Sequence, residues 1–176
     1  INDPEQYEMA LEYVEAVSPS LKSKIELFRK SKSLFEYYQI DYRLARDLAH
    51  KIWLKCGGYI IIDKTEALTV IDVNTGKYIG ADNLEDTVVK TNLEAAVEIA
   101  RQIRLRNIGG IIIIDFIDMK DEEHKKKVIA ALKDALKKDR AKTTVVGMTG
   151  LGLIEMTRKK VGDWLTLTIL CVKICW

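Results

Sequence analysis

The spacing of apolar and polar positions along the chain changes close to residue 50. Before that point, apolar side chains recur at helical spacing, first at Tyr7, Leu11 and Val14. Asp3 is a favourable N-cap and Pro4 suits the first helical position. The pattern predicts a helix at the start of the chain.

Weaker signals follow this helix. Ser18-Pro19-Ser20 ends it, and a loose alternation over 24–28 indicates a short strand. Asp41 is expected to cap a second helix, whose apolar positions include Leu44 and Leu48. The first part of the chain is therefore predicted to be mainly helical.

After residue 51, short and nearly continuous apolar runs predict buried strands. The predicted strands are 52–54, 59–62, 67–73, 111–114 and 143–146, with Gly57-Gly58 as the turn between the first two. Helical spacing returns twice between them. Thr91 and Glu94 have the spacing of a capping box, Gly109-Gly110 ends that helix, and 122–138 reads as a basic amphipathic helix. Strands alternating with helices predict an α/β fold with a mostly parallel sheet.

Composition adds only broad limits. Hydrophobic residues make up 48% and charged residues 31% of the 176 residues, which is typical of a folded globular chain. The net charge of +2 neither requires nor excludes a nucleic-acid partner. The three cysteines (Cys56, Cys171 and Cys175) cannot all pair within the chain, so a reducing cytoplasm is the simpler expectation. No segment reaches the roughly 18 apolar residues of a membrane span.

Two of the predicted strands end in a carboxylate, Asp72 and Asp115. A charge after such an apolar run is costly unless it is solvated, paired or bound to a cation. Ligand sites in parallel sheets lie beyond the carboxyl ends of the strands, so neighbouring strands would bring the two aspartates together. Asn74 shares a strand face with Asp72 and can fix its orientation. Paired carboxylates with open positions suit Mg²⁺.

Other interpretations of the same residues remain open. A strand-terminal aspartate is often a turn or N-cap residue, and composition does not separate Asp63 from Asp72. Asp118 is expected to cap the following helix. Trp53 and Tyr59 lie at strand spacing and are expected in the core rather than as base-stacking platforms. One helix displays three arginines together (Arg101, Arg104 and Arg106), which could face phosphates, but a solvated helix face is the default expectation.

Several motifs, in order and at matching distances, resemble the ribonuclease E/G family, in particular its RNase G branch. They lie at 57–74, 91–96, 99–106, 109–119, 139–141 and 152–158. The clear match covers about 52–161 and the stretch before it matches more loosely. Because the chain opens without Met, it is expected to be the catalytic core piece of a longer protein.

The resemblance implies a DNase I-like catalytic subdomain packed on part of an RNase H-like one. Residues 1–62 would hold the end of a sensor region and the RNase H-like part, and 63–161 the catalytic subdomain. Residues 162–176 would form a divergent tail, because Cys171 and Cys175 do not reproduce the family's Cys-Pro-x-Cys zinc element. No zinc site is expected.

The resemblance also implies residue roles. Asp72 and Asp115 would bind the catalytic Mg²⁺, and Asn74 would orient Asp72. The reaction would be hydrolysis of single-stranded A/U-rich RNA to 5′-phosphate and 3′-hydroxyl ends, in cytoplasmic RNA processing and decay, by a chain that can form homo-oligomers. Arg140 and Lys142 would contact RNA, with Lys142 standing where the family often has an arginine.

Two alternatives belong to other functional classes. The segment 71–76 faintly resembles the first phosphate loop of actin-like ATPases, but Gly109-Gly110 precedes its strand rather than following it. The second alternative is a non-catalytic RNA-binding or assembly fragment. The family's oligonucleotide-binding barrel and most of its 5′-end sensor are not in this sequence, and substrate positioning can supply roughly 7–11 kcal/mol of a barrier.

Overall fold

The computed structural model describes residues 1–76 and 84–161, and these residues fall into two compact units. The N-terminal unit is Ile1–Asp47, and the second unit, called the sheet unit below, begins at Leu48. The predicted tail at 162–176, with Cys171 and Cys175, lies outside the described residues. Across 1–76 and 84–161, no helix combines the length and apolar character that a bilayer crossing needs.

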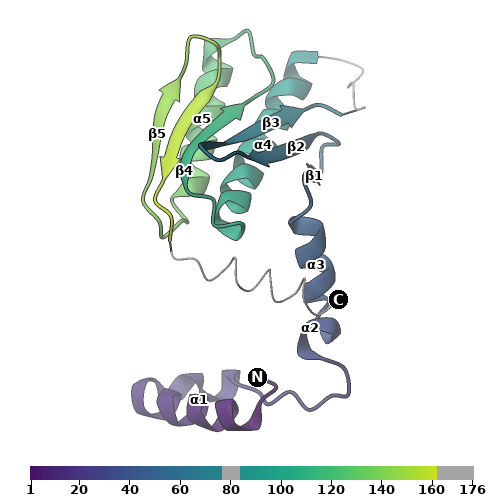
Figure 1. The fold of residues 1–176 in the computed structure, drawn as a ribbon, viewed down its shortest axis with the longest axis vertical. Coiled ribbons are helices and arrows are strands. Elements are labelled where there is room, and N and C mark those ends of the chain that lie inside the picture. Colours follow the sequence, from purple (N-terminus) through teal and green to yellow (C-terminus); the bar gives the residue numbers. More distant parts are fainter. Residues whose placement is uncertain (77–83, 162–176) are drawn as a thin grey trace. The chain divides into compact units, whose positions relative to one another are not determined.

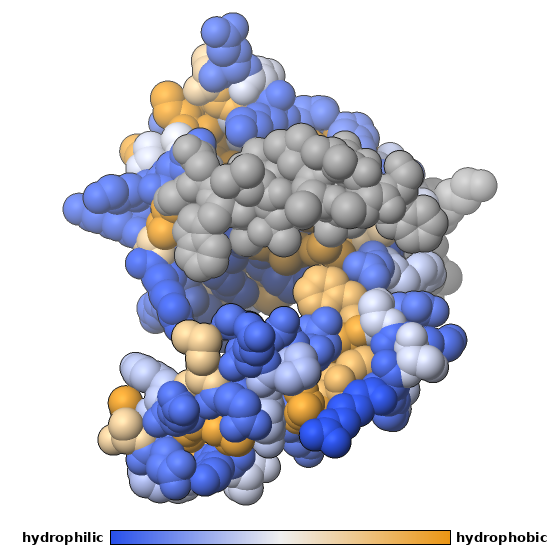
Figure 2. Space-filling view, turned by 60° about the horizontal axis from the view of Figure 1, so that its bottom comes forward, coloured by the Kyte–Doolittle hydropathy of each residue, from blue (hydrophilic) through white to orange (hydrophobic). Residues whose placement is uncertain are grey.

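The N-terminal unit is helical, as its sequence pattern predicts. It contains α1 (Pro4–Val17), the 3₁₀ helix η1 (Pro19–Lys24), α2 (Leu34–Tyr37) and α3 (Ile40–Asp47). Asp3 caps α1, because its side chain accepts a hydrogen bond from the Gln6 N–H at 2.9 Å. No residue of these four helices is buried, so the unit lacks a core of its own. Figure 2 shows one face of the molecule, on which apolar side chains lie among hydrophilic ones.

Two details of this unit differ from the prediction. The segment 24–28 is not a strand in a sheet. It pairs locally with the chain start, where the Phe28 N–H donates to the Ile1 carbonyl at 2.7 Å. Asp41 is not an N-cap but lies in the first turn of α3, which begins at Ile40. Gln39, whose φ is +56°, precedes that turn, and its carbonyl accepts a hydrogen bond from the Arg43 N–H at 3.1 Å.

The described part of the sheet unit contains a six-stranded sheet and two long helices (Figure 1). The strands are β1 (Lys51–Trp53), β2 (Tyr59–Lys64), β3 (Leu68–Asn74), β4 (Gly110–Asp115), β5 (Thr143–Met148) and β6 (Ile154–Arg158), and the helices are α4 (Leu84–Leu105) and α5 (Glu122–Leu136). The strand order is β1-β2-β3-β4-β6-β5. Strands β1 and β2 thus share a sheet with β3.

The mixed α/β class is confirmed, but the prediction of a mostly parallel sheet is wrong. Within the described residues only β3 and β4 pair in parallel, and the other four strand pairs are antiparallel. Short turns join β1 to β2, β2 to β3 and β5 to β6, and a short turn can connect only antiparallel neighbours. Strand β6, which the sequence pattern did not predict, inserts between β4 and β5 and runs against both.

One face of the sheet packs against α4 and α5, which lie side by side (Figure 1). The side chains between these layers are fully buried and include Ile60, Ile71, Ile99, Ile112, Ile114, Leu132 and Ile154. Burial alternates along β3, where Ile71 and Val73 are buried and Asp72 and Asn74 are partly exposed. The sheet face turned away from α4 and α5 is called the outer face below.

The predicted capping box at Thr91 and Glu94 is wrong, because α4 begins earlier, at Leu84. Thr91 donates its hydroxyl to the Thr87 carbonyl inside the helix. The Glu94 carboxylate instead accepts the backbone N–H groups of Lys55 and Cys56, at 2.5 and 3.0 Å. Burial acts to raise the pKa of Glu94, but these hydrogen bonds outweigh it and hold the pKa below its usual range. Glu94 therefore ties the β1–β2 turn to the helix layer.

Candidate functional site

Asp72 and Asp115 are direct neighbours at the end of the parallel strand pair. They face each other in the register of β3 and β4, as predicted from their positions after two apolar runs. Adjacent strands lie about 4.8 Å apart, so the two carboxylates emerge close together. Their preceding residues, Ile71 and Ile114, are fully buried on the helix side, so both aspartates belong to the outer face.

Asn74 lies beside this pair. Its Nδ2 donates a hydrogen bond to Asp72 Oδ2 at 2.7 Å. The two residues are separated by one position on β3 and therefore point to the same face. The amide restrains the Asp72 carboxylate, which is the orienting contact that the sequence predicted.

Negative charge accumulates at this end of the sheet. Burial, the nearby Asp72 and the nearby Asp118 all raise the pKa of Asp115. Asp118 does not cap α5, because Asp121 takes that position and accepts from the Glu123 N–H at 2.8 Å. The cluster therefore offers oxygen ligands together with unfavourable charge repulsion, which a bound cation would relieve.

We expect Asp115→Asn to raise the temperature of unfolding at pH 7 in a buffer without divalent ions. A carboxyl whose folded-state pKa is raised loses stability as the pH rises through that pKa, and asparagine removes this loss. The gain should shrink as the pH falls to where Asp115 is protonated. Thermal unfolding of both proteins across that range measures it. An asparagine variant that is less stable at pH 7 would contradict the charge argument.

Asp63, which composition could not separate from Asp72, has a different neighbour. It pairs with Val70, two residues before Asp72, and so lies one row away from the Asp72–Asp115 pair on the same sheet face. Its carboxylate lies 2.7 Å from His50 Nε2. The fold thus gives Asp72 a carboxylate neighbour and gives Asp63 a histidine.

Arg140 and Lys142 are not near the aspartate pair. They are exposed and immediately precede β5, whose first residue pairs with Arg158, and Arg158 pairs with Gly110 at the start of β4. About 3.3 Å of rise per residue separates that edge from Asp115 by most of the length of β4. Arg140 lines a pocket there with Arg104, Asn107, Lys138, Asp139, Ala141, Arg158 and Val161.

A buried ion pair stabilises this opposite edge, and no local sequence pattern predicts it. Arg158 Nε lies 2.7 Å from Asp139 Oδ2, and the two side chains are only 5% and 3% exposed. Arg158 also donates to the Ile108 carbonyl at 2.8 Å. Burial acts to raise the pKa of Asp139, but the hydrogen bonds from Arg158 and the Ala141 N–H lower it overall.

The three arginines expected on a solvated face all make contacts within the protein. Arg101 pairs with Glu98 at 2.8 Å, and Arg104 donates to the Ala135 carbonyl at 3.3 Å. Arg106 donates to the Ala49 carbonyl at 2.6 Å, and its burial lowers its pKa. Arg106 thus fixes the segment that leads into β1.

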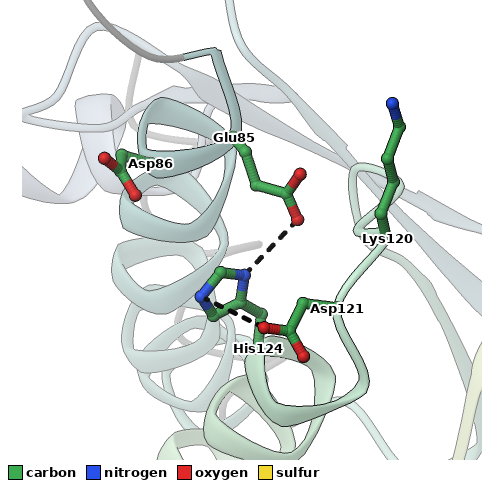
Figure 3. A pocket seen from close by; sticks show the side chains of 5 residues that line it. All are labelled: Glu85, Asp86, Lys120, Asp121 and His124. Atoms are coloured by element: carbon green, nitrogen blue, oxygen red, sulfur yellow. Dashed lines mark ion pairs between the residues drawn. The ribbon is translucent and has the colours of Figure 1, made fainter.

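A second polar pocket lies where α4 and α5 begin (Figure 3). It is lined by Glu85, Asp86, Lys120, Asp121 and His124. His124 Nδ1 is 3.4 Å from Glu85 Oε1, and its Nε2 is 4.0 Å from Asp121 Oδ2. Within residues 1–76 and 84–161, no group of three or more His, Cys, Asp or Glu side chains is placed to hold a metal ion. Asp72 and Asp115 are a pair rather than such a group, and their register on one sheet face makes them the candidate site.

Comparison with known proteins identifies the family of the chain. The family model "Ribonuclease E/G family" matches residues 1–161. The chain belongs to the ribonuclease E/G family. It is 50% identical over 154 residues to ribonuclease G of Escherichia coli strain K12, covering 88% of this chain and 32% of that protein.

Other relatives give the same assignment. The chain is 48% identical over 149 residues to ribonuclease G of Haemophilus influenzae strain Rd, covering 85% of this chain and 30% of that protein. It is 41% identical over 161 residues to ribonuclease E of Escherichia coli strain K12, covering 91% of this chain and 15% of that protein. The chain thus spans about a third or less of the length of these relatives.

Proposed function

We propose that this chain carries the catalytic centre of a Mg²⁺-dependent endoribonuclease. The observation that carries the proposal is the register of Asp72 with Asp115, with Asn74 bonded to Asp72. The relatives' names, ribonuclease G and ribonuclease E, supply the substrate class. The expected reaction is hydrolysis of single-stranded A/U-rich RNA, leaving 5′-phosphate and 3′-hydroxyl ends.

The residues fit a hard divalent cation. Two carboxylates on one sheet face provide the oxygen donors that Mg²⁺ prefers, and their mutual repulsion favours a cation between them. When bound there, Mg²⁺ would supply an activated water and stabilise charge on the phosphodiester. Asp72 and Asp115 hold the site's negative charge, and Asn74 keeps the Asp72 carboxylate in one orientation.

The surroundings extend this proposal. Residues 63–161 would correspond to the family's DNase I-like subdomain and 1–62 to the sensor end and RNase H-like part. Arg140 and Lys142 would contact the RNA backbone at the opposite edge of the sheet. We also propose a cytoplasmic location and an ability to form homo-oligomers, and the family resemblance supports both.

A cleavage assay tests the proposal. The purified chain is incubated with a fluorescent single-stranded A/U-rich RNA and Mg²⁺, beside an Asp72→Asn, Asp115→Asn double variant. We expect internal cleavage by the parent alone, with products carrying 5′-phosphates. Equal cleavage by both proteins would refute the site. RNA binding without cleavage by either would instead support a non-catalytic role for this part of the protein.

Asn74→Ala tests the orienting contact. Without the Nδ2 donor at 2.7 Å, the Asp72 carboxylate can rotate, so we expect the Mg²⁺ concentration for half-maximal cleavage to rise roughly 10- to 100-fold. The cleavage rate measured across a Mg²⁺ titration gives this value. Since a merely structural role would lower the rate at all Mg²⁺ concentrations alike, an unchanged half-maximal concentration would exclude the orienting role.

A further inference from the structure

The aromatic side chains expected in the core form a surface cluster instead. Trp53 is 62% exposed, so its predicted place in the core is wrong. Its ring lies edge-to-face with that of Tyr59, with centroids 5.3 Å apart. Lys51 Nζ lies 3.5 Å from the Tyr59 ring centroid and 4.3 Å from that of Trp53. These three residues are called the aromatic cluster below.

Strand register places the aromatic cluster on the same sheet face as the carboxylate pair. Trp53 pairs with Tyr59, which pairs with Asn74, so these three residues form one row across the sheet. The adjacent row runs from Lys51 through Ile61 and Asp72 to Asp115. Burial agrees, because Ile52 and Ile60, which point the other way, lie in the core.

The aromatic cluster and the carboxylate pair are close enough for one nucleic-acid strand to contact both. Two steps of about 4.8 Å separate the β1 position of Trp53 from the β3 position of Asn74. A nucleic acid lying across the outer face from β4 towards β1 would pass from the carboxylates to the aromatic cluster. Lys51 adds a positive charge beside the rings, which attracts an RNA phosphate. The carboxylate pair without a bound metal ion repels the RNA backbone.

We propose that the aromatic cluster is a stacking subsite that holds one base of a single-stranded RNA beside the carboxylate pair. The exposed Trp53 ring offers a π-face to an unstacked base, Tyr59 supports that ring edge-to-face, and Lys51 supplies a positive charge for the adjoining phosphate. A base inside a duplex has no free face for this contact, so the subsite selects single strands. This inference deepens the proposed function and rests on it for the identity of the ligand.

Binding measurements separate this inference from cleavage. The full chain carrying Asp72→Asn and Asp115→Asn serves as the background, so that a labelled A/U-rich RNA stays intact, and anisotropy gives its Kd. Adding Trp53→Ala should weaken binding roughly 5- to 100-fold, because base–aromatic stacking contributes about that factor per base. Trp53→Phe should lose less, since a ring remains. Lys51→Gln should weaken binding and reduce the salt dependence by about one phosphate contact.

Two controls make the result specific. Val97 is also a largely exposed apolar residue, at 56%, but lies on α4 behind the sheet, so Val97→Ala should leave the Kd unchanged. A series of RNAs, each with one abasic position, should include one RNA whose Kd is unchanged by Trp53→Ala. In that RNA the base that stacks on Trp53 is already missing. A duplex of the same sequence should be insensitive to Trp53→Ala.

The outcomes distinguish the two proposals. The subsite is overturned if Trp53→Ala changes the Kd by less than about twofold, or if Val97→Ala weakens binding as much as Trp53→Ala does. It is also overturned if the background protein without either substitution binds no RNA. Thermal unfolding of each variant identifies a loss caused by misfolding, and Trp53→Phe then decides by whether it restores binding. A Trp53-dependent Kd in a chain that never cleaves RNA would sustain the subsite and reject the nuclease.

Discussion

Asp72→Asn and Asp115→Asn should each lower Mg²⁺-dependent RNA cleavage by at least about 100-fold, and the double variant should be little worse than either one. The reason is geometric, since the two carboxylates are register partners on one face and serve one site. Residues that act as a unit lose most of their effect when either is removed. Single-turnover rates at saturating Mg²⁺ measure the three variants.

Asp63→Asn is the matched control for this series. Asp63 also follows an apolar run on the same sheet, but it contacts His50 and lies one row away from the Asp72–Asp115 pair. Its substitution should leave the cleavage rate within about twofold of the parent. A rate that falls as far with Asp63→Asn, or single effects that multiply in the double variant, would show that Asp72 and Asp115 do not form one catalytic unit.

Arg158→Met should lower the free energy of unfolding by about 3–5 kcal/mol, because it leaves Asp139 buried without its partner. The Arg158 guanidinium is 5% exposed and also binds the Ile108 carbonyl, so methionine replaces its volume but none of its hydrogen bonds. Urea unfolding at pH 7 measures the loss. Since the pKa of Asp139 is lowered, the pair stabilises the fold above the unfolded-state pKa of an aspartate, about 3.9. Its contribution is lost as the pH falls through the lower folded-state pKa.

Lys126→Met provides the comparison for an exposed ion pair. Lys126 and Glu123 are 2.7 Å apart, but their side chains are 70% and 66% exposed. The expected change is at most about 1 kcal/mol, because solvent screens such a pair. Equal losses in the two variants would show that burial of the Arg158–Asp139 pair does not determine its contribution.

Local sequence pattern predicted well the elements that are stabilised by contacts between residues close together in the sequence. Asp3 and Pro4 define the start of α1, and the β1–β2 hairpin forms around its two glycines. Sheet direction was predicted wrongly for two reasons. The short turns that join β1 to β2 and β2 to β3 force antiparallel pairing, and strand β6 inserts between β4 and β5. Which strands become neighbours depends on connection lengths and on the whole core, and periodicity within one segment does not contain that information.

The residues of the candidate site divide in the same way, into those that local pattern predicts and those whose positions depend on the whole fold. The pairing of Asp72 with Asp115 was predictable because a helix joins their strands and such a connection makes neighbours parallel. The exposure of Trp53 was not, since alternation along a strand does not say which sheet face another layer will cover. The Arg158–Asp139 pair was missed because its partners are 19 positions apart and only the fold brings them together.

Direct binding of a divalent ion tests the central claim most closely. The chain is titrated with Mn²⁺ as a spectroscopic substitute for Mg²⁺, and electron paramagnetic resonance of the free ion reports how much is bound. The structure predicts a site in the parent and in Asp63→Asn that Mg²⁺ competes for and that Asp72→Asn, Asp115→Asn lacks. Mn²⁺ binding that is equally tight in the double variant, or absent from the parent, would contradict the assignment of a metal centre to these two aspartates.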